Sequence, residues 1–500
     1  MASTRRWSCS AGLALSLVLA STGAAAQDAG SSGLAARLPD KLSTDVAAQD
    51  EASRRTMTAT DIADDFTFAA VGDILASRAE QITARNRDVA HVLQSADMTM
   101  GNFEAPVIDL RQRGLQPTNG GGFLISMPPE IPQSLSDWGF DMVGYANNHS
   151  MDWGVEGARD TIRRLEAAGI VSAGFGETRT GARSPAYFAT PKGRIALVSF
   201  TASYFGGNAA ADPLGAVPGV PGISALRTTP IDIVTREQFA TLREIDAQHN
   251  AGGLVGRRPT GDELLFRGRR FRVGDKPDTI YQINAEDQAD IIRSVRQAKQ
   301  QSNFLVVSVH NHEEPNCEQP VQSGDGSAWP CLAPPDFLRT MAHAVIDNGA
   351  DAFVGHGPHV LQGIEIYKGR PIFYSLGNLF ASLAGVTKLR DAIPTAMDAT
   401  RQTEAEYLEG MWSLYEQDST IFQTVIALSR YRGNRLAEIR LHPVDLGQHR
   451  RQADRGAPET PSPTVARQIL ERLQRLSAPF GTKISIEGNI GIIRISADSR

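Results

Sequence analysis

The sequence predicts an α/β fold built around a largely parallel sheet, and three observations support this prediction. Short apolar runs such as Ala352 to Val354 are typical of strands that are buried on both faces. These runs alternate with longer segments whose apolar spacing indicates helices. Polar residues follow directly after several runs, at the place where an open α/β sheet binds its ligands.

The composition is that of a globular protein. Of the 500 residues, 41% are hydrophobic and 21% are charged, so the chain can bury a large core in one large domain or in two or three ordinary ones. The net charge of −6 and the absence of a long basic run argue against general nucleic-acid binding. We therefore expect no nucleic acid among the partners.

The N-terminus has the features of a secretory signal peptide at residues 1–26. Arg5 and Arg6 precede an apolar run at 11–20, and three alanines at 24–26 form an A-x-A cleavage site. The run is too short for a permanent membrane span, and no second long apolar run follows. We expect ordinary export to the periplasm or the medium, although the arginine pair also allows twin-arginine export. Removal of this segment changes the net charge to −8, because it holds two arginines and no acidic residue.

Residues 27–64 are rich in Ala, Ser, Asp and Gly and lack apolar periodicity, which predicts a disordered linker. Cys9 leaves with the signal peptide, so Cys317 and Cys331 remain as a pair in an oxidising compartment. We expect a disulfide between them that contributes roughly 3 kcal/mol. The alternative is that both thiolates bind a metal.

The folded part begins with a strand, Phe66 to Val71, which is followed by Asp73. This aspartate could cap the next helix, which extends to about Gln94, or it could be a metal ligand. In the next strand Asn102 and Glu104 are two residues apart and therefore point to one face.

A third strand at 140–145 lies between helices expected at about 129–138 and 156–168. It ends in Asn147, Asn148 and His149. Turn chemistry would explain such a cluster, because asparagine tolerates left-handed conformations. A functional site explains it about equally well.

A strand at 194–200 is followed by a segment at 203–280 that breaks the regular alternation. We interpret this segment as an inserted lid or substrate-side loop with a helix at 235–248. Its arginines could line a path for an anion, but a solvent-exposed hairpin face is the simpler interpretation of each one. These arginines are Arg267, Arg269, Arg270 and Arg272.

The alternation resumes with a helix at 285–300 and a strand that ends at His310. If this strand continued, His310, His312 and Glu314 would share one face. A structural role is the weaker explanation for two histidines and two glutamates clustered at a strand end.

A helix at 335–348 leads to the strand Ala352 to Val354, and His356 and His359 follow it. The glycine and proline between these histidines prevent a helix, so both imidazoles can lie on one tight turn. Residues 361–374 predict a hairpin behind this turn.

The sequence after Phe380 predicts a polar, helical region to about residue 414. It then predicts strands at 420–429 and 435–442 and a proline-rich linker at 456–463. A helix at 463–476 and a hairpin turned by Gly488 and Asn489 complete the chain. We expect one domain at 65–445 and a helix-hairpin extension at 456–500.

Five strand ends thus deliver polar side chains to one edge of the predicted sheet, because the carboxyl ends of parallel strands converge. Carboxylate, amide and imidazole ligands together suit Mn, Fe or Zn, and their number is sufficient for two divalent ions. Two ions about 4 Å apart can hold a phosphoryl group and activate a water molecule. The candidate metal ligands are Asp73, Glu104, Asn148, His310, His312, His356 and His359.

Beside these ligands, His149 is the candidate catalytic residue, because an imidazole next to the metals can protonate the leaving oxygen. Weaker candidates for contact with the substrate are Asn102, Asn147, Glu314 and Arg227.

The motifs GDIL, GNFEAPV, YANNHSMDWG, VSVHNHEE and GHGPHVLQGIEIYKGRPIFYSLGNLF resemble the bacterial capsule-synthesis protein CapA family. The resemblance covers about 66–380, and its last motif is highly specific. That family is linked to poly-γ-glutamate capsule production and is similar to the calcineurin-like metallophosphoesterases. The resemblance therefore implies a metallophosphoesterase-type α/β sandwich with an inserted loop region.

The resemblance also implies a division of the ligands between two metals. One ion would have Asp73 and His359, the other would have His310, His356 and Asn148, and Glu104 would bridge them. Leu75 stands where metallophosphoesterases usually have a histidine, and Glu104 stands where they have an aspartate. His312 or a neighbouring glutamate would have to complete the first metal position.

The sequence thus favours an exported CapA-like, metal-dependent hydrolase that acts on a phosphoester or amide of a cell-envelope polymer or its precursor. The alternative is a non-catalytic polymer-binding or export factor with the same fold. The net charge of −8 argues against broad capture of a polyanion and so favours the enzyme. Expected partners are the anionic polymer or precursor and other capsule-synthesis proteins.

Overall fold

The computed structural model describes most of the chain from residue 61 to residue 495. The described residues are 61–109, 111, 118, 123–249, 261–315, 332–382, 388–389, 403, 406, 419–451 and 454–495. The predicted signal peptide, most of the predicted linker, the Cys317–Cys331 pair and most of the region to 414 lie outside them. Ile62 is buried and its N–H donates to Asn434 Oδ1 at 3.0 Å, so packed structure begins before the predicted strand at Phe66.

The first of two large sheets has nine strands, and its centre is parallel. Strands β18, β1, β2, β4 and β5 run parallel. On the side of β1 opposite β2, β20 is antiparallel to β1, and β21, β23 and β22 follow, each antiparallel to its neighbour. The bounds are β1 (Phe66–Ala76), β2 (Met98–Phe103), β4 (Met142–Gly144), β5 (Val171–Ala173), β18 (Asn378–Ser382), β20 (Gln423–Arg432), β21 (Arg435–Asp445), β22 (Ser485–Glu487) and β23 (Ile490–Arg494).

The second large sheet has six strands in the order β16-β17-β15-β14-β8-β7. Strands β17, β15, β14 and β8 are parallel, and the edge strands β16 and β7 are antiparallel to their neighbours. The bounds are β7 (Ala186–Thr190), β8 (Gly193–Thr201), β14 (Phe304–His310), β15 (Ala352–His356), β16 (Ile364–Tyr367) and β17 (Arg370–Phe373).

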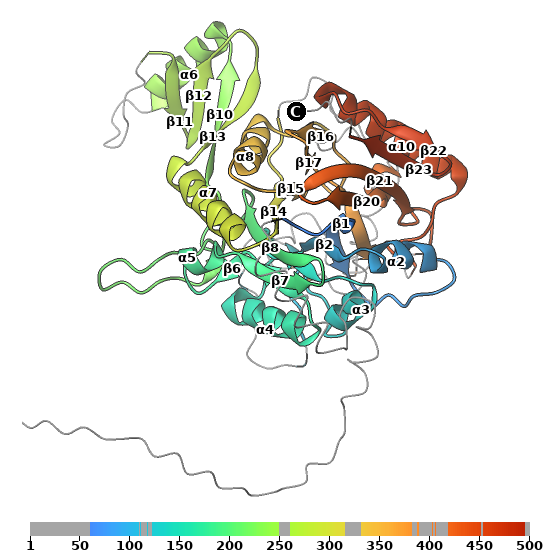
Figure 1. Ribbon diagram of the computed structural model, residues 1–500. Helices are drawn as coiled ribbons and strands as arrows, with labels where there is room; N and C mark the ends of the chain where they lie inside the picture. The colour runs from blue at the N-terminus through green and yellow to red at the C-terminus, as the bar shows by residue number, and fades with distance from the viewer. Residues whose placement is uncertain are drawn as a thin grey trace, which may run out of the picture. The chain divides into compact units, whose positions relative to one another are not determined.

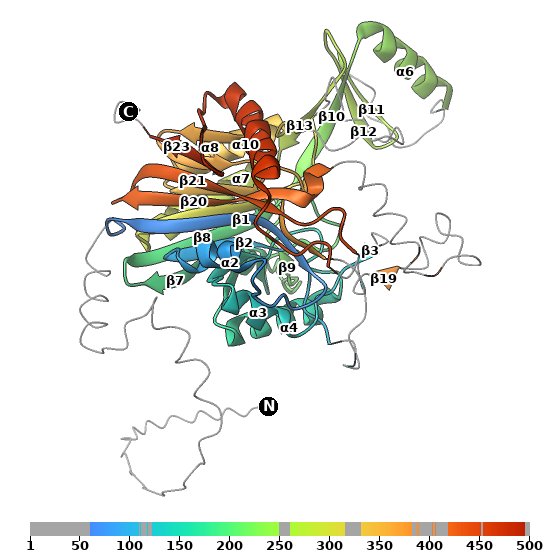
Figure 2. The ribbon, with the colours of Figure 1, turned by 90° about the vertical axis from the view of Figure 1, so that its right-hand side faces the viewer.

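The two sheets pack face to face, and helices cover their outer faces (Figures 1 and 2). Along β1, Phe66, Phe68 and Ala70 enter the core between the sheets, while Ala69 and Val71 enter the core under the helices. Both faces of the strand are therefore buried, which explains its continuous apolar run. The covering helices are α2 (Arg87–Gln94), α3 (Ile131–Asp137) and α4 (Gly154–Ala167) on the first sheet, and α7 (Ala285–Gln300) and α8 (Asp336–Asp347) on the second.

This arrangement of two packed sheets with helices on their outer faces confirms the predicted α/β sandwich. The short elements are β3 (Phe123–Leu124), β6 (Phe175–Gly176), α5 (Arg179–Ala182), β9 (Gly222–Ile223), β19 (Lys388–Leu389), η1 (Ser419–Phe422) and η2 (Ala478–Phe480). Among the described residues, no helix combines the length and the apolar character needed to cross a bilayer.

The segment predicted as an inserted loop contains a small sheet of its own. This sheet has the order β11-β12-β10-β13, and α6 packs against β11 and β12. In it Arg269 pairs with Asp232 at 2.7 Å and Arg272 pairs with Glu263 at 2.7 Å, so these two arginines lie on a solvent-exposed hairpin face. The bounds are β10 (Thr228–Val234), α6 (Arg236–His249), β11 (Glu263–Phe266), β12 (Arg269–Val273) and β13 (Asp278–Ile283).

The C-terminal helix and hairpin form as expected, and they pack on the main core. Helix α10 (Pro463–Ser477) places Leu470 and Leu473 in the core between the sheets, and β23 pairs with β21. Ser477 Oγ also accepts the N–H of Ile364 at 3.0 Å. The extension is therefore continuous with the large sandwich.

Substitution of Gly355 should destabilise the sandwich strongly. A Cβ atom at this position would lie 2.2 Å from the carbonyl oxygen of Tyr374, so β15 and β17 would have to separate. We expect Gly355→Ala to lower the free energy of unfolding by about 2 to 4 kcal/mol, measured by urea denaturation. Gly206→Ala is the matched control, because a Cβ atom there meets nothing within 4 Å. Equal stability of the two variants would contradict this packing.

Candidate metal centre

The described strand ends bring the predicted ligands together at the edge where the two sheets meet. In the first sheet Asp73 of β1 is in register with Asn102 of β2 and with Asn378 of β18. In the second sheet His310 and His356, the last residues of β14 and β15, are in register with each other. The convergence expected from a parallel sheet therefore occurs, with side chains supplied by both sheets.

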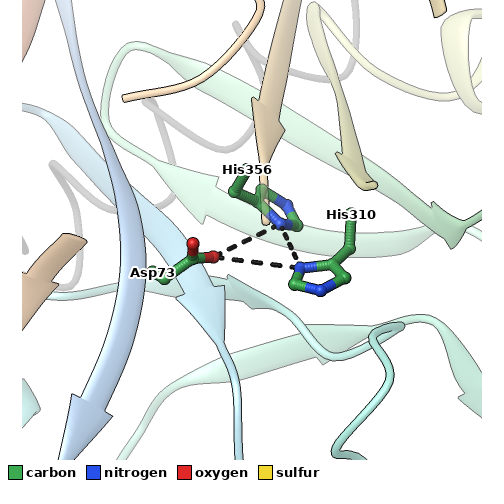
Figure 3. A group of neighbouring side chains, drawn as sticks. All are labelled: Asp73, His310 and His356. Atoms are coloured by element: carbon green, nitrogen blue, oxygen red, sulfur yellow. Dashed lines mark hydrogen bonds and ion pairs between the residues drawn. The ribbon is translucent and has the colours of Figure 1, made fainter. Parts of the chain in front are cut away.

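Asp73, His310 and His356 form one potential metal-binding group, and all three are buried (Figure 3). Asp73 Oδ1 lies 3.6 Å from His356 Nδ1 and 3.9 Å from His310 Nδ1, and the two imidazole nitrogens are 3.1 Å apart. The three side chains point toward one another, which leaves their lone pairs directed at a common point.

Glu104, His312 and His359 form a second group. Glu104 Oε1 lies 3.6 Å from His310 Nε2, 3.8 Å from His359 Nε2 and 3.9 Å from His312 Nε2. These separations exceed hydrogen-bond length but allow one cation to lie between Glu104, His312 and His359. The grouping differs from the one that the resemblance implied, because Asp73 groups with His310 and His356 and not with His359, and because Asn148 belongs to neither group. His312 takes part, as the compensating ligand that was expected.

The carboxylate of Glu104 gives the strongest indication that the centre binds a metal. Glu104 is 0% exposed, and neither of its oxygens has a hydrogen-bond partner among the described residues. An ionised carboxylate that is buried without hydrogen-bond donors is strongly disfavoured. Burial, the charge of Asp73 and a contact between the two carboxyl groups, which favours the protonated form, raise the pKa of Glu104 well above the usual value. A divalent cation would supply the missing partner, so the residues present fit a metal.

The electrostatics of the histidines also suit metal binding. Burial and the neighbouring imidazoles lower the pKa of His310 well below its usual value. Burial is also the main cause that lowers the pKa of His356 to about 4. The pKa of His312 is lowered as well, by desolvation and by the neighbouring His359, although its side chain is partly exposed. These three imidazoles are therefore neutral at physiological pH and have lone pairs to donate.

Asp73 and His359 behave as an ion pair within this group. Burial opposes charge on both, but the contact between His359 Nδ1 and Asp73 Oδ2 at 3.2 Å outweighs it. This contact and the charge of His356 lower the pKa of Asp73 to about 2, and the same contact raises the pKa of His359. Asp73 therefore remains ionised as a candidate ligand.

A hydrogen bond from a backbone N–H and two residues with positive φ fix the turn that carries His356 and His359. Gly357 has φ +116° and donates its N–H to Asp73 Oδ2 at 3.0 Å. A Cβ atom on Gly357 would lie 2.4 Å from the carbonyl oxygen of Asn311, so only glycine fits. His359 itself has φ +59°, a conformation that costs energy and is concentrated at functional sites.

Asn102 and Asn147, predicted as substrate contacts, are buried within a network of protein groups. Asn102 Nδ2 donates to Asp73 Oδ1 at 2.8 Å and lies 3.2 Å from His310 Nδ1. Asn147 Nδ2 donates to Asn102 Oδ1 at 3.1 Å and to the carbonyl of Phe103 at 2.9 Å. Their contacts position the ligands of the first group.

His149 lies at the rim of the centre and is oriented by a carboxylate. Its Nδ1 is 2.9 Å from Asp152 Oδ2, and its side chain is 14% exposed while that of Asp152 is buried. Asp152 is itself fixed by the N–H of Ile125 at 2.8 Å. This pair leaves Nε2 of His149 as the nitrogen that can exchange a proton with a bound molecule.

The other predicted residues lie in different surroundings. Strand β14 ends at His310, because the N–H of Asn311 binds the carbonyl of His356 and the N–H of His312 binds Ser203 Oγ. Glu314 is therefore outside the strand, exposed, with its carbonyl accepting from the hydroxyl of Tyr281.

Arg227 and Asn148 complete the predicted set. Arg227 pairs with Asp287 at 2.6 Å at the start of α7, so its charge is balanced by a carboxylate. Asn148 is partly buried in the loop between Asn147 and His149.

Three supporting residues were not among the predicted site residues. Ser308 Oγ lies 2.8 Å from His356 Nε2, Asn378 Oδ1 lies 2.9 Å from His359 Nδ1, and Asp152 orients His149. All three occur in the quoted motifs, but Ser308 lies inside an apolar strand, where a serine carries no further signal of function.

Ser308 should control metal affinity through His356. When Ser308 Oγ accepts a hydrogen bond from Nε2–H, the lone pair of His356 stays on Nδ1, which faces Asp73. We expect Ser308→Ala to weaken Mn²⁺ or Zn²⁺ binding by about 10- to 100-fold in calorimetric titrations. Ser199→Ala is the matched control, since Ser199 is in register on β8 and its hydroxyl has no partner among the described residues. Unchanged affinity in Ser308→Ala would contradict this role.

Comparison with known proteins identifies a family whose sequence model matches most of the described chain. The sequence matches the bacterial capsule synthesis protein family PGA_cap over residues 67–382. It is 40% identical over 463 residues to the uncharacterized protein y4sH of Sinorhizobium fredii, a match that covers 88% of this chain and 95% of that protein.

A more distant relative and a solved structure are also available for comparison. The chain is 26% identical over 334 residues to the capsule biosynthesis protein CapA of Bacillus anthracis, covering 65% of this chain and 62% of that one. A solved phosphatase from Mycoplasma pneumoniae aligns with a TM-score of 0.32 and 11% identity, covering 82% of this chain and 100% of that one. That score is too low to support an inference about function.

Proposed function

The chain belongs to the bacterial capsule synthesis protein family PGA_cap, and from this premise we propose that it is an exported, metal-dependent hydrolase. The substrate in this proposal is a phosphoester or amide of an anionic cell-envelope polymer, such as a poly-γ-glutamate capsule, or of its precursor. Export to the periplasm or the medium would also place Cys317 and Cys331 where they form a disulfide.

The observation that carries the proposal is the buried carboxylate of Glu104, which has no hydrogen bond among the described residues and faces three imidazole nitrogens. If Glu104 had only a structural role, we would expect N–H or O–H groups of the protein to donate hydrogen bonds to its carboxylate. In this proposal one divalent ion lies beside Asp73, His310 and His356, and a second lies beside Glu104, His312 and His359. Mn, Fe or Zn suits these ligands.

The chain's own residues divide the chemical work. Bound divalent ions would supply positive charge that stabilises the developing negative charge of the transition state and would lower the pKa of water. Asp73 holds negative charge in a buried place, and a bound cation would favour the ionised form of Glu104 as well. The neutral imidazoles of His310, His312 and His356 add no repulsion toward a cation. His149 donates a proton to the leaving oxygen or nitrogen, and Asp152 holds its imidazole in the required tautomer.

A second candidate function is that of a non-catalytic polymer-binding or export factor. The observation that favours it is Leu75, which is buried at the position where metallophosphoesterases usually supply a histidine ligand. The described centre compensates in part, because His312 joins Glu104. Such a factor would bind metal and polymer without turnover.

A turnover assay separates the two functions. The full chain is stripped with a chelator, reloaded with Mn²⁺ or Zn²⁺, and offered bis-p-nitrophenyl phosphate and a γ-glutamyl oligomer. The proposed hydrolase cleaves at least one of them only after reloading. Metal binding without cleavage of either substrate would favour the polymer-binding factor and contradict the hydrolase.

A further inference from the structure

A hairpin that leaves the sheet edge near the candidate metal centre exposes several apolar side chains to solvent. Six large apolar side chains are exposed in the described part of the chain, and three of them lie between Ala211 and Val220. Leu214 is 81% exposed, Val217 is 65% exposed and Val220 is 45% exposed. We call residues 211–220 the apolar hairpin; Figure 1 shows it in green, projecting beyond α5 and β6.

The hairpin is preformed. Leu214 and Val217 exchange two backbone hydrogen bonds of 3.0 Å, and Ala211 and Val220 exchange two of 3.0 and 2.9 Å. Gly215, with φ +59°, opens the two-residue turn at the tip. Order at the tip therefore does not depend on a partner.

The base of the hairpin is fixed to the body of the protein. Asp212 accepts the N–H of Thr180 at 2.8 Å and its hydroxyl at 3.0 Å, and Asp212 also pairs with Arg179 at 3.4 Å. The projection is thus rigid at its root and apolar at its end.

The composition of the hairpin suits an apolar solvent. No charged residue occurs from Pro213 to Leu226, and the prolines at 213 and 218 have no N–H to leave unpaired. The backbone pairs Leu214–Val217 and Ala211–Val220 satisfy four N–H and four C=O groups within the hairpin, which lowers the cost of moving the tip out of water.

We propose that the apolar hairpin inserts its tip into the surface of a lipid bilayer. Three side chains cannot supply the about 800 Å² per partner that a stable protein–protein interface buries, whereas burial of a few apolar side chains is enough for weak, reversible binding to a bilayer surface. The net charge of −6 provides no general attraction to anionic lipids, so the association depends on apolar burial.

Anchoring would hold the candidate metal centre near the bilayer. The hairpin follows β8, whose last residue, Thr201, is in register with His310 and donates its hydroxyl to the His310 carbonyl at 3.1 Å. The edge that carries the ligands is therefore the edge from which the hairpin leaves. This inference stands whether or not the centre turns over a substrate.

The test uses the full chain and phosphatidylcholine vesicles. The reporter Leu214→Trp should show a blue-shifted emission with vesicles and quenching by brominated phosphatidylcholine. Leu265→Trp is the matched control, because Leu265 is 59% exposed on the small sheet and should show neither change. The double variant Leu214→Glu, Val217→Glu should co-sediment with vesicles about 100-fold more weakly, with little dependence on salt.

Three results would overturn the proposal. These are no co-sedimentation of the wild-type chain, equal binding of the double variant, or a blue shift that needs no vesicles and follows dimer formation in ultracentrifugation. The last result would assign the hairpin to a second copy of the chain. Because the hairpin side chains are exposed, the double variant should keep its unfolding temperature, which confirms that it is folded.

Discussion

Replacement of His149 by alanine should lower the turnover of any cleaved substrate by about 10² to 10⁴-fold while leaving the metal content unchanged. The imidazole is at the rim, with Nδ1 held by Asp152 at 2.9 Å, and it belongs to neither potential metal group. Its loss therefore removes a proton donor without removing a metal ligand. The measurement is the turnover number together with elemental analysis of the same preparations.

Two further variants sharpen this prediction. Asp152→Asn should lower turnover less than His149→Ala, because the imidazole remains but its tautomer is no longer held. His343→Ala is the matched control, since His343 lies on α8, stacks on Tyr367 and hydrogen-bonds Glu365 away from the centre. Turnover in His149→Ala equal to that of the wild type would remove His149 from the mechanism.

Replacement of Glu104 by glutamine should change stability in opposite directions with and without metal. In metal-free protein the buried carboxylate lacks hydrogen bonds, so Glu104→Gln should raise the free energy of unfolding by about 1 to 3 kcal/mol at neutral pH. With saturating Mn²⁺ the wild type should gain about 4 kcal/mol at 1,000 times Kd, and the variant should gain much less. Thermal unfolding with and without metal measures both effects.

The pH dependence of this difference has a definite sign. The folded protein raises the pKa of Glu104 above the unfolded value, so the folded state holds the proton more tightly. The contribution to stability is therefore present below the unfolded pKa and is lost as the pH rises through the folded pKa. The stabilising effect of Glu104→Gln on metal-free protein should thus grow with pH, whereas the exposed carboxylate of Glu314 should give no such effect in Glu314→Gln.

Much of the fold could be predicted because local signals agree with the tertiary structure. The helix expected at 285–300 and the amphipathic helix at the C-terminus appear as α7 and α10, where apolar spacing and burial coincide. The turn of Lys368 and Gly369, both with positive φ, joins the expected hairpin strands β16 and β17. Polar residues at strand ends indicated the candidate centre, because parallel strands share one carboxyl edge.

The remaining features depend on contacts between distant segments. The small sheet at 228–283 was expected as a loop, because its strands are only partly buried and its arginines obscure the alternation. Ser308 resembles any strand serine until β15 places His356 beside it. The role of Asn102 likewise appears only when β1, β2 and β14 meet, since its partners are Asp73 and His310.

The most direct test of the account is the metal content of the wild-type chain after purification without added metal or chelator, repeated after loading with Mn²⁺ and desalting. Elemental analysis of the loaded wild type should give two divalent ions per chain, and Glu104→Gln should retain at most one. A wild-type chain that holds no more metal than Asp73→Asn combined with Glu104→Gln would contradict the candidate metal centre and the hydrolase built on it.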